Sequence, residues 1–187
     1  ENKALLELVS ETRALLEKHD EISSGKDVPE FLDDVRSRFN DLMDVDKHYL
    51  RKENLLFPYL EKHGITGPPK VMWGKHDEIR ELLKGSFEGL ETKDDINPEE
   101  AEVLIQMVLL PTLKAIEDMV TKEEEILLPM SLDKLTDMEW YQVHLDTTLI
   151  GFCLYDPPYD WKPENIEEIP EEQNGNGTIN LPSGNMT

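Results

Sequence analysis

The sequence predicts an all-α protein, an up-down four-helix bundle followed by a short C-terminal β segment and an extended linker. Three observations support this class of fold. Four segments carry apolar residues at steps of three and four, which is the pattern of an amphipathic helix. Turn-forming residues separate these segments, and the ends of the second and fourth segments resemble each other. With 187 residues, the chain has room for one domain with its own core and some appended segments.

The first predicted helix covers about residues 1–22, and a stretch rich in serine and glycine, residues 23–27, ends it. The second covers about residues 29–62. Gly64 follows it closely, and glycine suits the left-handed conformation that often closes a helix. We therefore expect the first two helices to form an antiparallel hairpin.

The third predicted helix begins at residues 67–69, Gly-Pro-Pro, and runs to about Leu90. Proline in a first turn removes no hydrogen bond that the helix would otherwise make. The fourth begins at the N-cap residue Asn97 and ends at about Met130. Pro111 lies inside it and is expected to kink it.

The pattern changes after the fourth helix. Residues 139–155 are rich in β-branched and aromatic side chains with partial alternation, which predicts a strand or hairpin packed on the bundle. Proline, glutamate, asparagine and glycine then dominate, as in an extended linker. We expect three parts: a helical bundle in residues 1–131, a β appendage in residues 132–155 and a linker in residues 156–187.

Charge and composition exclude several classes of function. The formal net charge is −22, so the chain would be repelled by nucleic acid and by anionic membrane surfaces. No apolar run is long enough to span a bilayer. The single cysteine, Cys153, allows no intramolecular disulfide and favours a reducing compartment. A cytoplasmic location is the expectation, with no nucleic-acid or membrane partner.

An internal repeat links the ends of the second and fourth helices. Residues 48–58 align with residues 119–129, so that Glu53 falls on Glu124 and each segment ends in proline. Two similar helical hairpins that pack together give a pseudo-symmetric bundle. Convergence on a common helix-end sequence is the alternative explanation.

Several charged residues fall on the apolar stripes of these helices, where core residues are expected. An unpaired carboxylate in a core is costly, so each must reach water, a cation or a hydrogen-bond network. Residues that lie equally far from one end of the bundle share a layer and can meet in the core. His19 falls at the other end of the bundle, so it is not among the residues that can converge. The converging candidates are His48, Glu53, His76 and Glu124, together with Glu123 and Glu1.

Imidazole and carboxylate groups together suit iron, manganese or zinc, and carboxylate-rich bundle cores often hold two irons. The spacing of His48 and Glu53 is a weakness, because five residues place them about 140° apart around a helix. His48 must lean inward to share an ion with Glu53. A metal-free network among the core carboxylates is the alternative, and His19 and His63 are expected at a cap or on the surface.

Residues 48–64 and 67–80 resemble the DUF438 branch of the hemerythrin-like HHE cation-binding proteins, and the similarity extends over about residues 1–155. The resemblance implies a non-haem iron site, mononuclear or dinuclear, with roles for the His48/Glu53 pair, His76 and Glu124. It also implies a DUF438 segment upstream and a PAS sensory domain downstream, so we expect this chain to be a fragment. Met72 and Met119 stand where many relatives have histidines, so iron could be lost here or replaced by another divalent metal.

The resemblance leads to three hypotheses for function. The first is a cytoplasmic sensory or regulatory domain in which iron responds to oxygen, nitric oxide or redox state. The second is an iron-dependent enzyme that consumes peroxide or nitric oxide. The third is a metal-free helical interaction module. The partners to expect are a metal ion, a small diatomic or redox signal and, as an option, a second copy in a homodimer.

Overall fold

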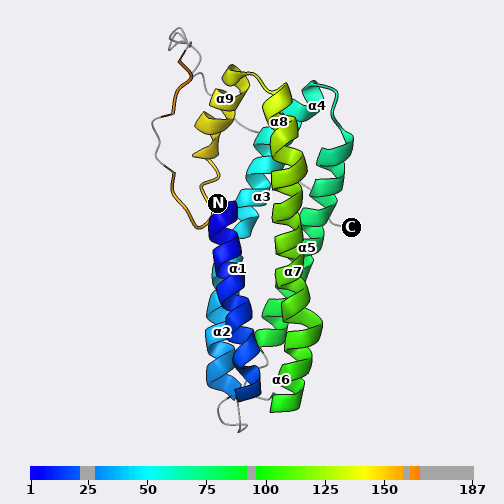
Figure 1. Cartoon of the computed structure of the whole chain (residues 1–187), viewed down its shortest axis with the longest axis vertical. Coiled ribbons are helices and arrows are strands. Elements are labelled where there is room, and N and C mark those ends of the chain that lie inside the picture. The colour runs from blue at the N-terminus through cyan, green and yellow to red at the C-terminus, as the bar shows by residue number, and fades with distance from the viewer. Residues whose placement is uncertain (22–27, 92–95, 158–160, 165–187) are drawn as a thin grey trace, which may run out of the picture.

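A computed structural model describes residues 1–21, 28–91, 96–157 and 161–164. Long helical segments lie side by side and antiparallel to one another (Figure 1), and this confirms the predicted helical bundle. Segment α1 contacts α2 and α7, and α5 contacts the same two, so the segments form a square in cross-section. No described helix is both long and apolar enough to cross a membrane.

The predicted helices are each built from one or more shorter elements. The first comprises α1 and the 3-10 helix η1, and the third is the single helix α5. In the second, a turn at residues 43–44 separates α2 from α3, and a short π-helix joins α3 to α4; in the fourth, short π-helices join the α-helices. Their bounds are α1 (Asn2–Leu16), η1 (Glu17–Glu21), α2 (Val28–Leu42), α3 (Val45–Arg51), η2 (Lys52–Leu56), α4 (Phe57–Lys62), α5 (Gly67–Glu91), α6 (Pro98–Leu104), η4 (Ile105–Leu109), α7 (Leu110–Lys122), η5 (Glu123–Leu127) and α8 (Leu128–Lys134).

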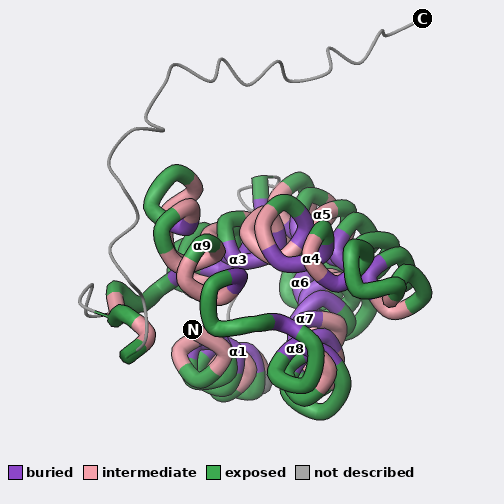
Figure 2. Tube along the Cα trace, turned by 90° about the horizontal axis from the view of Figure 1, so that it is seen from above, coloured by how far each residue is buried: buried purple, intermediate pink, exposed green. Residues whose placement is uncertain are grey.

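The apolar stripes face one another and form a continuous core. Figure 2 shows the buried positions on the inner sides of the helices and the exposed positions outside. Leu5 of α1, Phe39 of α2 and Leu113 of α7 have no solvent exposure, and Ile79 of α5 is 2% exposed. Burial of such side chains is the main favourable contribution to folding of the bundle.

Each π-helix lies directly before a proline. Pro58, Pro111 and Pro129 are the second residues of α4, α7 and α8, and η2, η4 and η5 end just before these helices. A proline has no N–H, and its ring collides with the carbonyl four residues earlier in a regular α-helix. The wider π-turn gives the ring room. The internal repeat therefore has a structural counterpart, a π-turn followed by proline in both halves of the bundle.

The predicted β segment is wrong, because this part of the chain is the helix α9 (Asp137–Thr147). A capping box starts the helix: Glu139 N–H donates to Thr136 Oγ1 at 3.3 Å, and Thr136 N–H donates to Glu139 Oε2 at 3.0 Å. The aromatic and β-branched side chains Trp140, Val143 and Thr147 recur at helical steps of three and four and line a pocket against the bundle.

The segment after α9 folds back onto the bundle. Its turns include Gly151 in the left-handed region, with φ of 91°, and Leu154, with φ of 55°. Most of the predicted linker, residues 156–187, lies outside the described residues. The division into three parts therefore stays a prediction.

Candidate functional site

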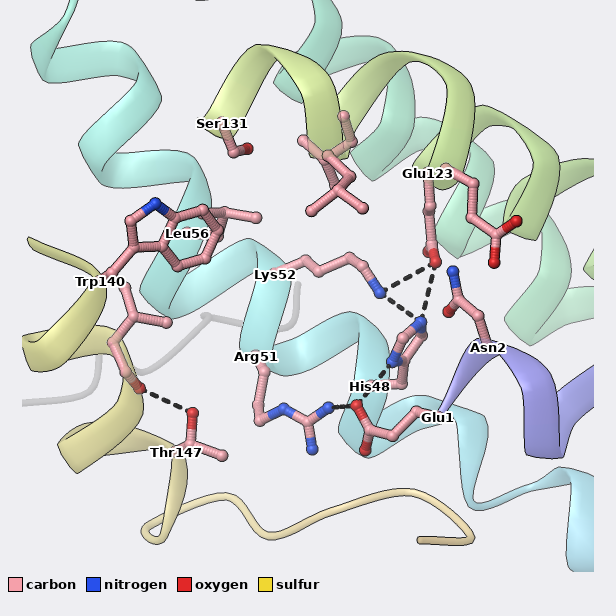
Figure 3. A pocket seen from close by; sticks show the side chains of 14 residues that line it. Glu1, Asn2, His48, Arg51, Lys52, Leu56, Glu123, Ser131, Trp140 and Thr147 are labelled. Carbon is pink, nitrogen blue, oxygen red and sulfur yellow. Dashed lines mark hydrogen bonds and ion pairs between the residues drawn. The ribbon is translucent and has the colours of Figure 1, made fainter. Parts of the chain in front are cut away.

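Two buried polar clusters lie in the half of the bundle that contains α3, η2 and η5. The first, which we call the lysine cluster, consists of Glu1, His48, Arg51, Lys52 and Glu123 (Figure 3). His48 is 5% exposed; its Nδ1 lies 3.1 Å from Glu1 Oε2, and its Nε2 lies 2.9 Å from Glu123 Oε2. Residues from α3, η5 and the start of the chain thus meet at one imidazole.

Lys52 is one of two basic residues in this cluster, and it is the one that pairs with Glu123. It lies one helical turn after His48, so both side chains project from the same face. The Lys52 ammonium lies 3.0 Å from Glu123 Oε2 and also contacts His48 Nε2. An ammonium only donates hydrogen bonds and a carboxylate only accepts them, so in any one protonation state His48 Nε2 bonds either to Lys52 as an acceptor or to Glu123 as a donor.

Burial sets the protonation states of the lysine cluster. Burial lowers the pKa of Lys52 to about 8, and the negative charge of Glu123 opposes this effect. Burial alone would raise the pKa of Glu123, but the charge of Lys52 and the hydrogen bond of His48 outweigh it and hold that pKa at about 2. Burial and the Lys52 charge lower the pKa of His48. Near neutral pH, Lys52 is therefore an ammonium, Glu123 a carboxylate and His48 a neutral imidazole.

Glu1 and Arg51 connect the lysine cluster to the segment after α9. Arg51 forms an ion pair with Glu1 Oε2 and donates to the carbonyl of Gly151 at 2.5 Å. Glu1 Oε1 accepts a hydrogen bond from the backbone N–H of Cys153 at 2.6 Å. Burial raises the pKa of the Cys153 thiol to about 11, so this side chain is a core residue and not an activated nucleophile.

The second group, the arginine cluster, surrounds Glu53, which is 3% exposed. Arg80 binds its carboxylate through two parallel hydrogen bonds of 2.9 Å, and His76 Nδ1 lies 2.7 Å from Glu53 Oε1. Arg80 also binds Asp46 at 2.7 Å. The Tyr49 ring stacks on His76, with ring centroids 4.0 Å apart. Burial would raise the pKa of Glu53, but the hydrogen bonds from His76 and Arg80 lower it.

The structure places the predicted site residues in these two clusters, with one exception. Glu1, His48 and Glu123 belong to the lysine cluster, and Glu53 and His76 belong to the arginine cluster. Glu124, which the repeat pairs with Glu53, is exposed, and its neighbour Glu123 is buried instead. His19 lies elsewhere, with its Nδ1 2.9 Å from the carbonyl of Leu16. Whether any of these residues binds a metal stays a prediction.

Sequence reasoning missed the three basic residues that neutralise the core carboxylates: Arg51, Lys52 and Arg80. A signal was present, because Lys52 follows His48 and Arg80 follows His76 by four residues, the spacing that places both side chains on one helical face. Long basic side chains also bury their stems readily along apolar surface. A basic residue four positions from a core histidine therefore indicates an internal counter-ion.

The residues as arranged do not fit a metal. Among the described residues, no group of three or more His, Cys, Asp or Glu side chains could hold one. Several buried atoms in the described part of the chain lack a hydrogen-bond partner, and two of them, His76 Nε2 and Glu123 Oε1, are of the types that bind metals. However, a cation about 4 Å from the Lys52 ammonium would be repelled by about 4 kcal/mol per unit charge at an effective dielectric constant of about 20.

A helical bundle with histidines and carboxylates buried together in its core defines a class of cation-binding bundles. The chain belongs to the hemerythrin family, because the sequence model of the hemerythrin HHE cation-binding domain matches residues 1–131. No curated protein matches the chain. The DUF438 branch of this family stays a prediction.

Proposed function

We propose that this domain is a regulatory module of the hemerythrin family in which Lys52 supplies, from within the chain, the cation that the core site holds. The observation that carries this proposal is the Lys52 ammonium, which contacts both His48 Nε2 and Glu123 Oε2, two atoms that lie 2.9 Å apart. A buried carboxylate needs a positive partner, and this one has it without a metal. The arginine cluster follows the same design, with Arg80 on Glu53.

A regulatory role is supported by the connection from the lysine cluster to the segment after α9. Glu1 binds both His48 and the backbone of Cys153, and Arg51 binds both Glu1 and the backbone of Gly151. A change in charge at His48 or Lys52 therefore alters the contacts that hold this segment. We propose that the segment transmits the state of the site to neighbouring parts of the protein.

An iron-binding sensor that responds to oxygen, nitric oxide or redox state is the second candidate. Two of the unpartnered buried atoms, His76 Nε2 and Glu123 Oε1, favour it, because imidazole nitrogen and carboxylate oxygen are common ligands of iron. In this candidate the Lys52 side chain has to leave its place before an ion binds. The two candidates therefore differ in the cation that lies against Glu123, which is the Lys52 ammonium in the first and an iron ion in the second.

Ferrous iron separates the two candidates. The experiment adds ferrous iron anaerobically to the wild type and to Lys52→Met, removes unbound metal by gel filtration, and measures bound iron and the melting temperature. The proposal predicts no stoichiometric iron and an unchanged melting temperature for the wild type. Stoichiometric iron with a raised melting temperature in the wild type would support the iron sensor instead. The variant Lys84→Met, at an exposed position of α5, controls for the loss of one positive charge.

A further inference from the structure

A pocket of about 410 Å³ lies between the bundle and α9, directly beside the lysine cluster (Figure 3). Trp140, Val143 and Thr147 line it from α9, and Leu56 and Leu127 line it from the bundle. Its volume falls in the range of small-molecule sites, which are largely apolar with a few placed polar groups. The family description assigns nothing to α9, which follows the matched residues.

Three polar atoms of the described pocket lining lack a hydrogen-bond partner, Asn2 Oδ1, Ser131 Oγ and Glu123 Oε1, and the last two belong to buried residues. Ser131 is 0% exposed and Glu123 is 2% exposed. Within the described part of the chain, neither Ser131 Oγ nor Glu123 Oε1 has a hydrogen-bond partner. Both residues line the pocket, and Figure 3 shows the Ser131 side chain pointing into it. Buried polar atoms normally have partners, so these two indicate where a bound molecule makes its hydrogen bonds.

The charges around the pocket select a neutral ligand. Lys52 neutralises Glu123, and Arg51 neutralises Glu1, so the floor of the pocket consists of ion pairs. A cationic ligand would meet the Lys52 ammonium. An anionic ligand would meet the carboxylate of Glu123 and that of Glu124, which also lines the pocket.

We infer that this pocket binds a neutral, mainly apolar small molecule that carries one hydroxyl or N–H group, of the size of phenol or indole. The hydroxyl or N–H donates to Glu123 Oε1, and the Ser131 hydroxyl donates to the ligand or accepts from it. The apolar body packs against Trp140, Leu56 and Leu127. The inference rests on the proposed function, because it requires the Lys52 ammonium to remain beside Glu123.

Phenol and toluene test the inference, because they share a shape and differ in the hydroxyl. The probes are titrated across the millimolar range into the full chain, and binding is followed by ¹H–¹⁵N NMR at Trp140, Val143 and Thr147. We expect saturable shifts with phenol and at least about tenfold weaker binding of toluene, the value of one hydrogen bond to a charged group. Ser131→Ala is expected to weaken the binding of phenol and to leave the binding of toluene unchanged.

A blocking variant and its control locate the site. Val143→Trp fills the pocket and is expected to abolish phenol binding, whereas Leu149→Trp, at a position that is 76% exposed and outside the lining, is expected to retain it. The absence of saturable shifts with phenol, or equal affinity for toluene, would overturn the inference.

The metal content of the same samples separates this failure from that of the proposed function. Stoichiometric metal in a sample that binds phenol contradicts the proposed function and the role given to the Lys52 ammonium, and it leaves only the location of the phenol site supported. If the protein is metal-free and does not bind phenol, the inferred ligand binding is overturned and the proposed function is not.

Discussion

Replacing Lys52 with methionine removes the positive charge that pairs with Glu123 and keeps most of the side-chain volume. The Lys52 ammonium lies 3.0 Å from Glu123 Oε2, so at an effective dielectric constant of about 20 the attraction is about 5 kcal/mol. Part of this is offset by desolvation of the ammonium, which also lowers its pKa to about 8. Since Glu123 would remain buried without a cation, we expect a loss of about 3–5 kcal/mol in the free energy of unfolding.

A double-mutant cycle measures this coupling. The free energy of unfolding is obtained from urea denaturation, followed by circular dichroism, for the wild type, Lys52→Met, Glu123→Met and the double variant. The double variant contains neither charge, so its loss is expected to be within about 2 kcal/mol. Lys84→Met, at an exposed position, should change stability by about 0.5 kcal/mol or less. If Lys52→Met costs under about 1 kcal/mol and the cycle is additive, Lys52 is not the partner of Glu123.

Three further predictions concern the arginine cluster, pH and α9. Arg80→Met should cost about 3 kcal/mol by the same urea assay, since it leaves a buried carboxylate, whereas Arg38→Met, in an exposed ion pair, should cost about 1 kcal/mol or less. Between pH 4.5 and about 2, the Glu123 carboxylate binds a proton more readily in the unfolded chain than in the folded protein, so the free energy of unfolding should fall as the pH drops through this window. The fall should be less steep in Glu123→Gln, and equal slopes would contradict the low pKa of Glu123. Thr136→Ala removes the N-cap of α9 and should speed amide hydrogen exchange in α9 about fivefold, with the exchange rates of α5 unchanged. Unchanged exchange rates in α9 would show that the cap does not stabilise this helix.

The helical bundle could be predicted because the residues that specify each helix lie close together in the sequence. Apolar residues at steps of three and four define the helical faces, and glycine, proline and asparagine mark their ends. The β segment was wrong because Trp140, Val143 and Thr147 suit a strand by residue type. Their spacing and the Thr136–Glu139 capping box favour a helix, and the box lies just before the residues that suggested a strand.

The candidate site could be predicted only in part. The apolar stripes identified Glu53 and His76 as buried polar residues, and both are buried; His48, which the sequence placed on the flank of its stripe, is buried as well. A regular helical wheel could not predict which of Glu123 and Glu124 is buried. Both lie in the π-helix η5, whose wider turn does not follow the 3.6-residue period of an α-helix.

A crystal structure of the protein grown with ferrous iron under anaerobic conditions, with anomalous diffraction data at the iron edge, tests the central claim most directly. The decisive position is the one in contact with both His48 Nε2 and Glu123 Oε2. We predict the Lys52 ammonium at this position and no anomalous peak. An iron peak bound to His48 and Glu123, with the Lys52 side chain turned away, would contradict the claim that the domain supplies its own cation.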